Sequence, residues 1–266
     1  MFLSNNNKGT SSVPIWSLRN AKAMVDMLRW FASSQIRNVA SLAGNLCTAS
    51  PISDMNPVLL ASGATIDVQG VDAKEVRSIQ MTNFFVGYRR IALNKDEIVV
   101  SIHIPGTKEY EFTRAYKQAK RRDDDISIVN ACFRCQIDPS TNQIISLATG
   151  FGGMAATTVG SPSAEATASS TTLQVGGSSD ANDDANDFGL HLTTSLTSDM
   201  MLAPNVPGGM AAYRTTLVLS FARKFVAHLK SELNMKGVDP RDMSLPETFL
   251  ASERPVTSGV QSYQCK

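Results

Sequence analysis

The stretch at residues 39–57, V-A-S-L-A-G-N-L-C-T-A-S-P-I-S-D-M-N-P, constrains this chain more than any other. Ala43 and Gly44 leave its backbone almost bare, so another molecule can approach the N–H groups closely. Thr48 and Ser53 add hydroxyl donors, and the Asp54 carboxylate can accept from paired hydroxyls such as a sugar edge. Neither common nucleotide loop, G-x-G-x-x-G or G-x-x-x-x-G-K-[ST], occurs here. The composition predicts either a turn that holds a phosphorylated ligand or a plain Gly- and Ser-rich turn between a helix and a strand.

Composition narrows the class of protein. A chain of 266 residues predicts about two domains, each able to bury its own core. A net charge of +1 offers no basic surplus for nucleic acid, and no apolar run approaches the length of a membrane span. Residues 1–12 lack the apolar segment of a signal peptide. The 4 cysteines are too few and too scattered for a disulfide framework, which indicates a reduced, intracellular protein.

The first half of the chain alternates helical and extended patterns. A helix is expected from Ser17, capped by Ser17 or Asn20, with an apolar stripe at Ala21, Met24, Val25, Leu28 and Phe31. A helical turn at 58–61 and two short strands at 64–69 and 75–81 follow. Residues 97–105 read as a strand with one face formed by Ile98, Val100, Ile102 and Ile104.

The second half is expected to begin near residue 110 with strands at 112–118, 126–137 and 143–150. Cys132 and Cys135 lie three apart on a strand and point to opposite faces, and no second Cys pair exists, so a zinc or redox site is not predicted. The K-R-R-D-D-D run at 120–125 cancels its own charge, which predicts a solvated, self-paired loop. A contact with a charged diffusible partner is the alternative.

The end of the chain combines a polar segment with a strongly amphipathic helix. Residues 155–200 are rich in Ser, Thr, Ala, Gly and Asp, a composition that buries little and favours mobility. His228 is expected to face solvent on the flank of a helix over residues 210–233. This helix directs a core-facing stripe inward at Tyr213, Leu217, Phe221, Phe225 and Leu229.

Several motifs together resemble the flavin-binding portion of the xanthine dehydrogenases, in the molybdenum hydroxylase family. They keep the family's order along the chain: the 39–57 stretch, F-F-V-G-Y-R-R at 84–90, D-E-I-V-V-S-I-H-I-P at 96–105, Y-K-Q-A-K-R-R-D-D-D-I at 116–126, F-G-G-M at 151–154, P-G-G-M-A-A-Y-R-T-T-L-V-L-S-F at 207–221 and R-P-V-T-S-G-V-Q-S-Y-Q at 254–264. Their shared order makes the resemblance stronger than any one motif. The S-P-I-S-D sequence favours xanthine dehydrogenase over the related aldehyde oxidases.

The resemblance implies an α+β fold built from two flavoprotein domains. After a disordered tail at 1–16, residues 17–107 would form the second half of a PCMH/VAO-type FAD-binding domain. Residues 108–234 would form an α/β domain like the C-terminal domain of carbon monoxide dehydrogenase flavoprotein, an antiparallel sheet packed by helices that includes the low-complexity segment 155–200. Residues 235–266 would form a linker toward a molybdopterin domain that this chain lacks.

The resemblance also assigns roles to individual residues. Lys117 would lie near the polar edge of the flavin, where positive charge favours the reduced anionic form. Tyr88 would lie on the side of NAD, and Asp124 in the loop that decides between NAD and oxygen as acceptor. Asp54 would bind cofactor hydroxyls, and Ser41 to Asn45 the pyrophosphate. The full set implied to bind FAD is Phe31, Ser41, Leu42, Ala43, Gly44, Asn45, Thr48, Ser53, Asp54, Ile98, Val99 and Lys117.

The function that follows is FAD-mediated electron transfer from purine oxidation to NAD, within a fragment that has no molybdenum or 2Fe-2S site of its own. The implied partners are FAD, NAD, the other domains of the enzyme and a second copy in a homodimer. Neither nucleic acid nor membrane is among them, and the expected location is the cytoplasm, with the peroxisome as the alternative.

Two departures from the family qualify this function. The family's upstream Gly-Asn-Thr phosphate loop has no counterpart in residues 1–15, so FAD binding is expected to be weak. Ala43 replaces the first Gly of the family's G-G-N, which requires a negative φ there. The alternatives are a non-catalytic remnant that binds a partner and a fragment of an aldehyde oxidase-like flavoprotein.

Overall fold

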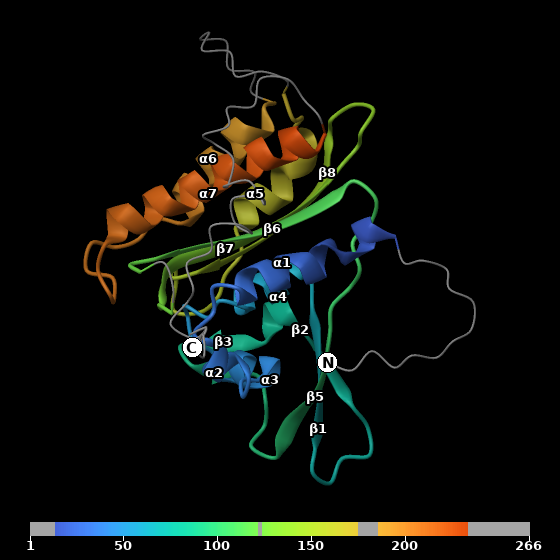
Figure 1. Cartoon of the computed structure of the whole chain (residues 1–266), viewed down its shortest axis with the longest axis vertical. Helices are drawn as coiled ribbons and strands as arrows, with labels where there is room; N and C mark the ends of the chain where they lie inside the picture. Colours follow the sequence, from blue (N-terminus) through green and yellow to red (C-terminus); the bar gives the residue numbers. More distant parts are fainter. Residues whose placement is uncertain (1–13, 122–123, 175–185, 234–266) are drawn as a thin grey trace, which may run out of the picture.

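The computed structural model describes residues 14–121, 124–174 and 186–233, which form two parts packed along one antiparallel sheet (Figure 1). Most of the tail predicted at 1–16 and all of the linker predicted at 235–266 lie outside the described residues. The first part contains four α-helices and five strands. They are η1 (Ile15–Leu18, 3-10), α1 (Arg19–Leu28), α2 (Ser34–Arg37), α3 (Leu42–Cys47), α4 (Asn56–Ser62), β1 (Thr65–Gly70), β2 (Arg77–Gln80), η2 (Met81–Asn83, 3-10), β3 (Phe85–Gly87), β4 (Arg90–Ile91) and β5 (Glu97–His103).

The β2-β1-β5 sheet corrects one expectation about β5. Val68 pairs with Val99 and Asp67 with Ser101, so Val100 is an extra residue in the register. This β-bulge breaks the period of two and turns the residues before it the other way. Ile98 is 65% and Val100 51% exposed. The predicted single face of Ile98, Val100, Ile102 and Ile104 is therefore wrong, and the residues that pack on the core are Val99, Ile102 and Ile104.

Helix α1 also buries a different face from the one its apolar pattern predicts. The buried residues are Asn20, Ala23 and Met27, whereas Val25 is 52% exposed. Asn20 does not cap the helix: its Nδ2 donates to Pro105 O at 2.8 Å, and its Oδ1 accepts from Thr113 Oγ1 at 2.7 Å. Because both amide atoms are bonded, a polar residue can occupy the buried face.

The second part is built on the β6-β7-β8 sheet, with β6 (Glu111–Ala119), β7 (Ser127–Ile137) and β8 (Ile144–Gly152), and confirms the three predicted strands. Cys132 packs with Met27 and Met55 of the first part, whereas Cys135 belongs to the core under the helices. The two thiols thus lie on opposite faces, as predicted. Burial raises the pKa of both thiols, so they stay protonated and unreactive.

Helices cover one face of this sheet (Figure 1). The ring of Phe225 in α7 (Ala211–Glu232) stacks on Phe133 at 5.0 Å between centroids, and Phe221 stacks on Tyr116 at 5.5 Å. The predicted stripe of this helix is confirmed except for Tyr213, which is 46% exposed. The remaining helices here are α5 (Pro162–Thr167), η3 (Ala168–Ser170, 3-10) and α6 (Phe188–Asp199).

The segment at 155–200 packs better than its composition predicts. Phe188, Leu192 and Leu196 of α6 are fully buried, and Leu173 is nearly so. The expectation that this segment buries little is wrong for its described residues, because a few large side chains at helical spacing suffice to attach it to the core. Residues 175–185 lie outside the described residues.

His228 is buried, not solvent-facing as predicted. It is 9% exposed on α7, and its Nε2 accepts a hydrogen bond from Arg114 Nε on β6. Burial first, and then the cations Arg114, Lys22 and Arg19, lower its pKa to about 3. The ring is therefore neutral near pH 7, and its 3.3 Å contact with Glu232 is not an ion pair there.

Helices α1 and α4 lie on the opposite face of the β6-β7-β8 sheet (Figure 1). Glycines on β8 allow segment 51–57 to approach: a Cβ added to Gly150 would collide with Pro57 O, and one added to Gly152 would lie 3.2 Å from Pro51 O. Gly153 N donates to Pro51 O at 2.8 Å. Segment 51–57 is thereby pressed onto the ends of β7 and β8. Among the described helices, none has the length and apolarity to cross a membrane.

Candidate functional site

The stretch that opens the sequence folds into a short helix and a turn, not an open loop. Ser41 caps α3, its Oγ accepting from Gly44 N at 3.0 Å. Ala43 lies in this helix and is not among the residues of positive φ, which meets the condition that its replacement of the family's Gly required. Asn45 Oδ1 accepts from Ser53 Oγ at 2.6 Å, which links α3 to the turn that carries Asp54.

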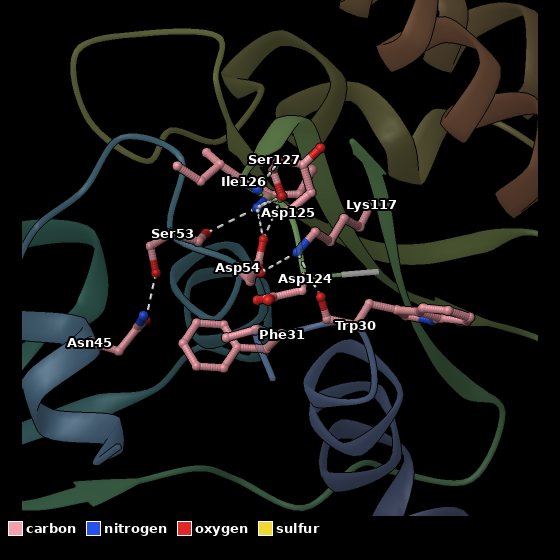
Figure 2. Close-up of polar contacts among 12 residues, drawn as sticks. Trp30, Phe31, Asn45, Ser53, Asp54, Lys117, Asp124, Asp125, Ile126 and Ser127 are labelled. Carbon is pink, nitrogen blue, oxygen red and sulfur yellow. Dashed lines mark hydrogen bonds and ion pairs between the residues drawn. The ribbon is translucent and has the colours of Figure 1, made fainter. Parts of the chain in front are cut away.

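Asp54 is the centre of a buried polar network that joins the two parts of the molecule (Figure 2). Lys117 Nζ, from β6, donates to Asp54 Oδ2 at 2.6 Å and to Trp30 O at 2.8 Å. Asp54 Oδ1 accepts from Ser127 Oγ and, at 3.1 Å, from Asn130 Nδ2. The side chains of Lys117 and Asp54 are each only 7% exposed. In this buried environment the two opposite charges stabilise each other, and removal of either side chain leaves the other charge buried and unpaired.

The network leaves some hydrogen-bonding capacity unused. An ammonium has three donors, and Lys117 uses two of them, on Asp54 and Trp30, among the described residues. Asp54 Oδ1 accepts two bonds, whereas Oδ2 accepts only the one from Lys117. One cationic donor and one anionic acceptor therefore remain for a ligand that has both kinds of group.

The charged loop lies next to this network, directly before Ser127. Arg121 N donates to Asp125 Oδ2 at 2.7 Å, and an Arg121 guanidinium nitrogen lies 3.6 Å from Asp125 Oδ1. These backbone and charged contacts lower the pKa of Asp125. Its described residues confirm the self-paired loop. Asp124, with a φ of 48°, turns the chain back toward β7.

The structure brings together only part of the predicted flavin set. Phe31 follows Trp30, whose carbonyl Lys117 binds, and the α3 residues reach the network through Asn45 and Ser53 (Figure 2). Tyr88 is 60% exposed in the β3–β4 hairpin and takes no part in the hydrogen bonds of the Asp54 network. Ile98 and Val99 point away from each other, so one flat ring cannot lie against both side chains in this arrangement.

Ser127, Asn130 and the Trp30 carbonyl belong to the site but were not predicted. A signal for Asn130 exists: it interrupts the apolar run I-V-N-A-C on a strand, where asparagine is disfavoured unless its amide is bonded. Ser127 and the carbonyl carry no such signal. Among the residues that the structure describes, no group of three or more His, Cys, Asp or Glu side chains could hold a metal ion.

Two families match this chain. Residues 10–107 match the FAD binding domain in molybdopterin dehydrogenase, and residues 114–184 match the CO dehydrogenase flavoprotein C-terminal domain. The junction between them contains the start of β6, so the Asp54–Lys117 pair joins one matched family to the other.

Curated relatives agree with both matches. Xanthine dehydrogenase of Oryza sativa subsp. japonica is 39% identical over 256 residues, 93% of this chain and 18% of the relative. Xanthine dehydrogenase of Emericella nidulans is 42% identical over 238 residues, 89% of this chain and 16% of the relative. The chain thus spans about a fifth of the length of the curated relatives it matches.

Solved structures show the same fold at lower identity. A CO dehydrogenase chain from Oligotropha carboxidovorans gives a TM-score of 0.68 at 17% identity, over 82% of this chain and 70% of that chain. Quinoline 2-oxidoreductase from Pseudomonas putida 86 gives 0.63 at 17% identity, over 82% of this chain and 73% of that chain. The predicted fold class is confirmed, and the chain belongs to the xanthine dehydrogenase-like molybdenum hydroxylases, as part of their FAD-binding portion.

Proposed function

We propose that this chain holds FAD at the junction of its two parts and serves electron transfer in an oxidoreductase that oxidises purines and reduces NAD. The observation that carries the proposal is the buried Asp54–Lys117 pair, in which Lys117 has one further N–H donor and Asp54 Oδ2 can accept one further hydrogen bond. Purine as substrate is inferred from the name of the xanthine dehydrogenases. NAD as acceptor, a homodimer and an intracellular location rest on the family resemblance.

The residues present fit a flavin dinucleotide in their chemistry. FAD, when bound, supplies hydride and single-electron transfer. The isoalloxazine edge carries both carbonyl oxygens and N–H groups, which match the spare donor of Lys117 and the spare Oδ2 acceptor of Asp54. The exposed residues Ser41, Gly44 and Thr48 offer a small, polar surface at α3 for the phosphates. Ser41 Oγ accepts from Gly44 N and would keep its O–H for a phosphate, whereas Thr48 Oγ1 already donates to Gly44 O.

Each residue then has a definite task. Lys117 would place a fixed positive charge at the polar edge of the ring, and Asp54 would hold that charge in place. Phe31, half-buried beside Trp30, would cover one face of the ring. The role of Tyr88 and Asp124 toward NAD rests on the family resemblance alone.

The proposal is tested by titrating the purified chain with FAD and following the quenching of flavin fluorescence and the visible absorption of the bound flavin. We expect weak but saturable binding at one site per chain, lost in Lys117→Met. Lys230→Met, a change in the last turn of α7, is the matched control and should bind as the wild type does.

Two results would overturn the proposal. Absence of saturable FAD binding by the wild-type chain would favour the non-catalytic remnant. Equal binding by wild type and Lys117→Met would move the flavin away from the Asp54–Lys117 pair.

A further inference from the structure

We propose that Asn130, together with Ser127, is a positioning residue of the flavin site, which fixes the Asp54 carboxylate so that only Oδ2 faces the ligand. The inference rests on the proposed function and goes beyond it, since neither residue belongs to the set implied by the resemblance. Both lie on β7, in the part of the chain that matches the CO dehydrogenase flavoprotein C-terminal domain.

The orientation of the Asn130 amide is determined by its neighbours. Its Nδ2 donates at 3.1 Å to both Asp54 Oδ1 and Ser53 O, and lies 3.3 Å from Ser127 Oγ. A rotated amide would place an oxygen against the carboxylate and the Ser53 carbonyl, two acceptors that repel it. The nitrogen therefore faces Asp54.

The other end of the amide shows what this orientation costs. Asn130 is fully inaccessible to solvent, and its buried Oδ1 has no hydrogen-bond partner among the residues that the structure describes. It faces Gly152 on the paired strand β8, where any side chain would collide with it. A buried acceptor without a partner is destabilising, so a packing role alone would be better served by an apolar residue. The amide is explained by what its nitrogen does.

The nitrogen and the Ser127 hydroxyl together occupy Asp54 Oδ1. With both bonds made, the carboxylate cannot rotate about its last torsion without breaking one of them. Oδ2 is then held toward Lys117, and the ammonium keeps one donor free. Asn130 thereby sets the direction of both ligand-facing groups without touching the ligand.

A second buried asparagine provides a matched control. Asn20 is 1% exposed and likewise joins the first part to the β6-β7-β8 sheet, because its Oδ1 accepts from Thr113 Oγ1 while its Nδ2 donates to Pro105 O. It makes no hydrogen bond to the Asp54 network. Asn20→Leu therefore removes a comparable buried amide without touching the proposed positioning.

The experiment measures two properties of the full chain for wild type, Asn130→Leu, Asn130→Asp, Ser127→Ala and Asn20→Leu. The first is the rate at which N-hydroxysuccinimide acetate acetylates Lys117, mapped by mass spectrometry against exposed lysines of the same chain, without flavin. The second is FAD affinity by fluorescence quenching. Ser127→Ala is the mildest of the three site variants and serves if either Asn130 variant fails to fold.

We expect acetylation of Lys117 to rise about tenfold in both Asn130 variants, and FAD affinity to fall about tenfold to a hundredfold. Ser127→Ala should change both in the same direction by less, and Asn20→Leu should change neither. Unchanged acetylation in the site variants, or an equal rise in Asn20→Leu, would overturn the inference. If acetylation rises as expected but wild type binds no FAD, the positioning of Asp54 and Lys117 stands and the proposed function fails.

Discussion

The two faces of the β6-β7-β8 sheet are built from opposite kinds of side chain. Toward α6 and α7, strand β7 presents Ala131, Phe133, Cys135 and Ile137, within a continuous aromatic and aliphatic core. Toward α1 and α4, the same strand presents Asn130, Cys132 and Arg134, which meet Asp54, a small apolar cluster and Glu111. One alternating strand thus serves a dry interface and a polar one.

This difference shows which face of the sheet mainly stabilises the fold and which one fixes the positions of the polar groups. Apolar contacts are non-directional, so the helical face resists unfolding but specifies little. Hydrogen bonds to a buried carboxylate hold only in one arrangement, so the other face fixes the positions of Asp54 and Lys117. Glycines at 150 and 152 complete this second face by letting residues 51–57 approach the sheet.

The largest effect is expected on the helical face. Phe133→Ala removes a fully buried ring that contacts both Phe151 and Phe225, and should lower the free energy of unfolding by about 4 kcal/mol. Chemical denaturation followed by circular dichroism measures this. Lys117 acetylation in the folded protein should stay at the wild-type rate. A rise comparable to that of the Asn130 variants would show that the two faces are not independent.

The next effect is expected at the polar face. Lys117→Met leaves the Asp54 carboxylate buried without its cation and should cost about 3 kcal/mol of stability. Adding Asp54→Asn removes the stranded charge while keeping an acceptor for Ser127 and Asn130, so the double variant should recover about half of the loss. FAD binding should not return. If stability and FAD binding both recovered in the double variant, the polar face would not fix the geometry of the site separately from its contribution to stability.

The contrast between apolar packing and directional hydrogen bonds also explains what could be predicted from the sequence. The strands at 112–118, 126–137 and 143–150 and the stripe of α7 are confirmed, because a long apolar pattern on a buried element leaves few alternatives. The stripe of α1 failed because Asn20, a polar residue, is buried through bonds to residues 105 and 113, far along the chain. The spacing of apolar residues within one helix does not predict hydrogen-bond partners that lie far along the chain.

The candidate site shows the same limit more sharply. Asp54 and Lys117 could be singled out, one from its stretch of small polar residues and both from the family resemblance, yet their direct pairing was not predicted. The Asp54 carboxylate and the Lys117 ammonium are 63 residues apart in sequence and meet only because β6 and segment 51–57 are packed together. The burial of His228 was missed for an equivalent reason, since its partner Arg114 is 114 residues away.

At the edge of β6 the two faces meet, and there the effect depends on pH. Arg114 contacts Asp26 of α1 at 3.7 Å and also His228 and Glu232 of α7. Because the pKa of His228 is lowered to about 3, the unfolded chain takes up a proton below about pH 6.5 that the folded chain does not. Stability supplied by this group is present above pH 6.5 and falls as the pH is lowered.

Between pH 7 and pH 5 the loss from His228 should be about 2 kcal/mol. Denaturation curves of wild type and His228→Gln at both pH values measure it, because titrations of other groups are common to the two proteins. The variant should show a smaller loss over this interval. Parallel curves would indicate that His228 takes up its proton in the folded protein as readily as in the unfolded chain, against its lowered pKa.

The smallest effect on stability is expected at the exposed β5 residue that the resemblance assigns to the flavin. The bulge at Val100 leaves Ile98 65% exposed, so Ile98→Ser should change the free energy of unfolding by no more than about 0.5 kcal/mol. If its side chain nevertheless covers the ring, FAD affinity should fall while stability does not. Val99→Ala is the contrasting variant. Because Val99 packs on the core of the first part, this variant should have a lower free energy of unfolding. The side chains of Ile98 and Val99 point to opposite faces of β5, so only one of them can lie against the ring. A fall in FAD affinity with Ile98→Ser alone would place the flavin on the exposed face of β5. A fall with Val99→Ala alone would place it on the opposite face.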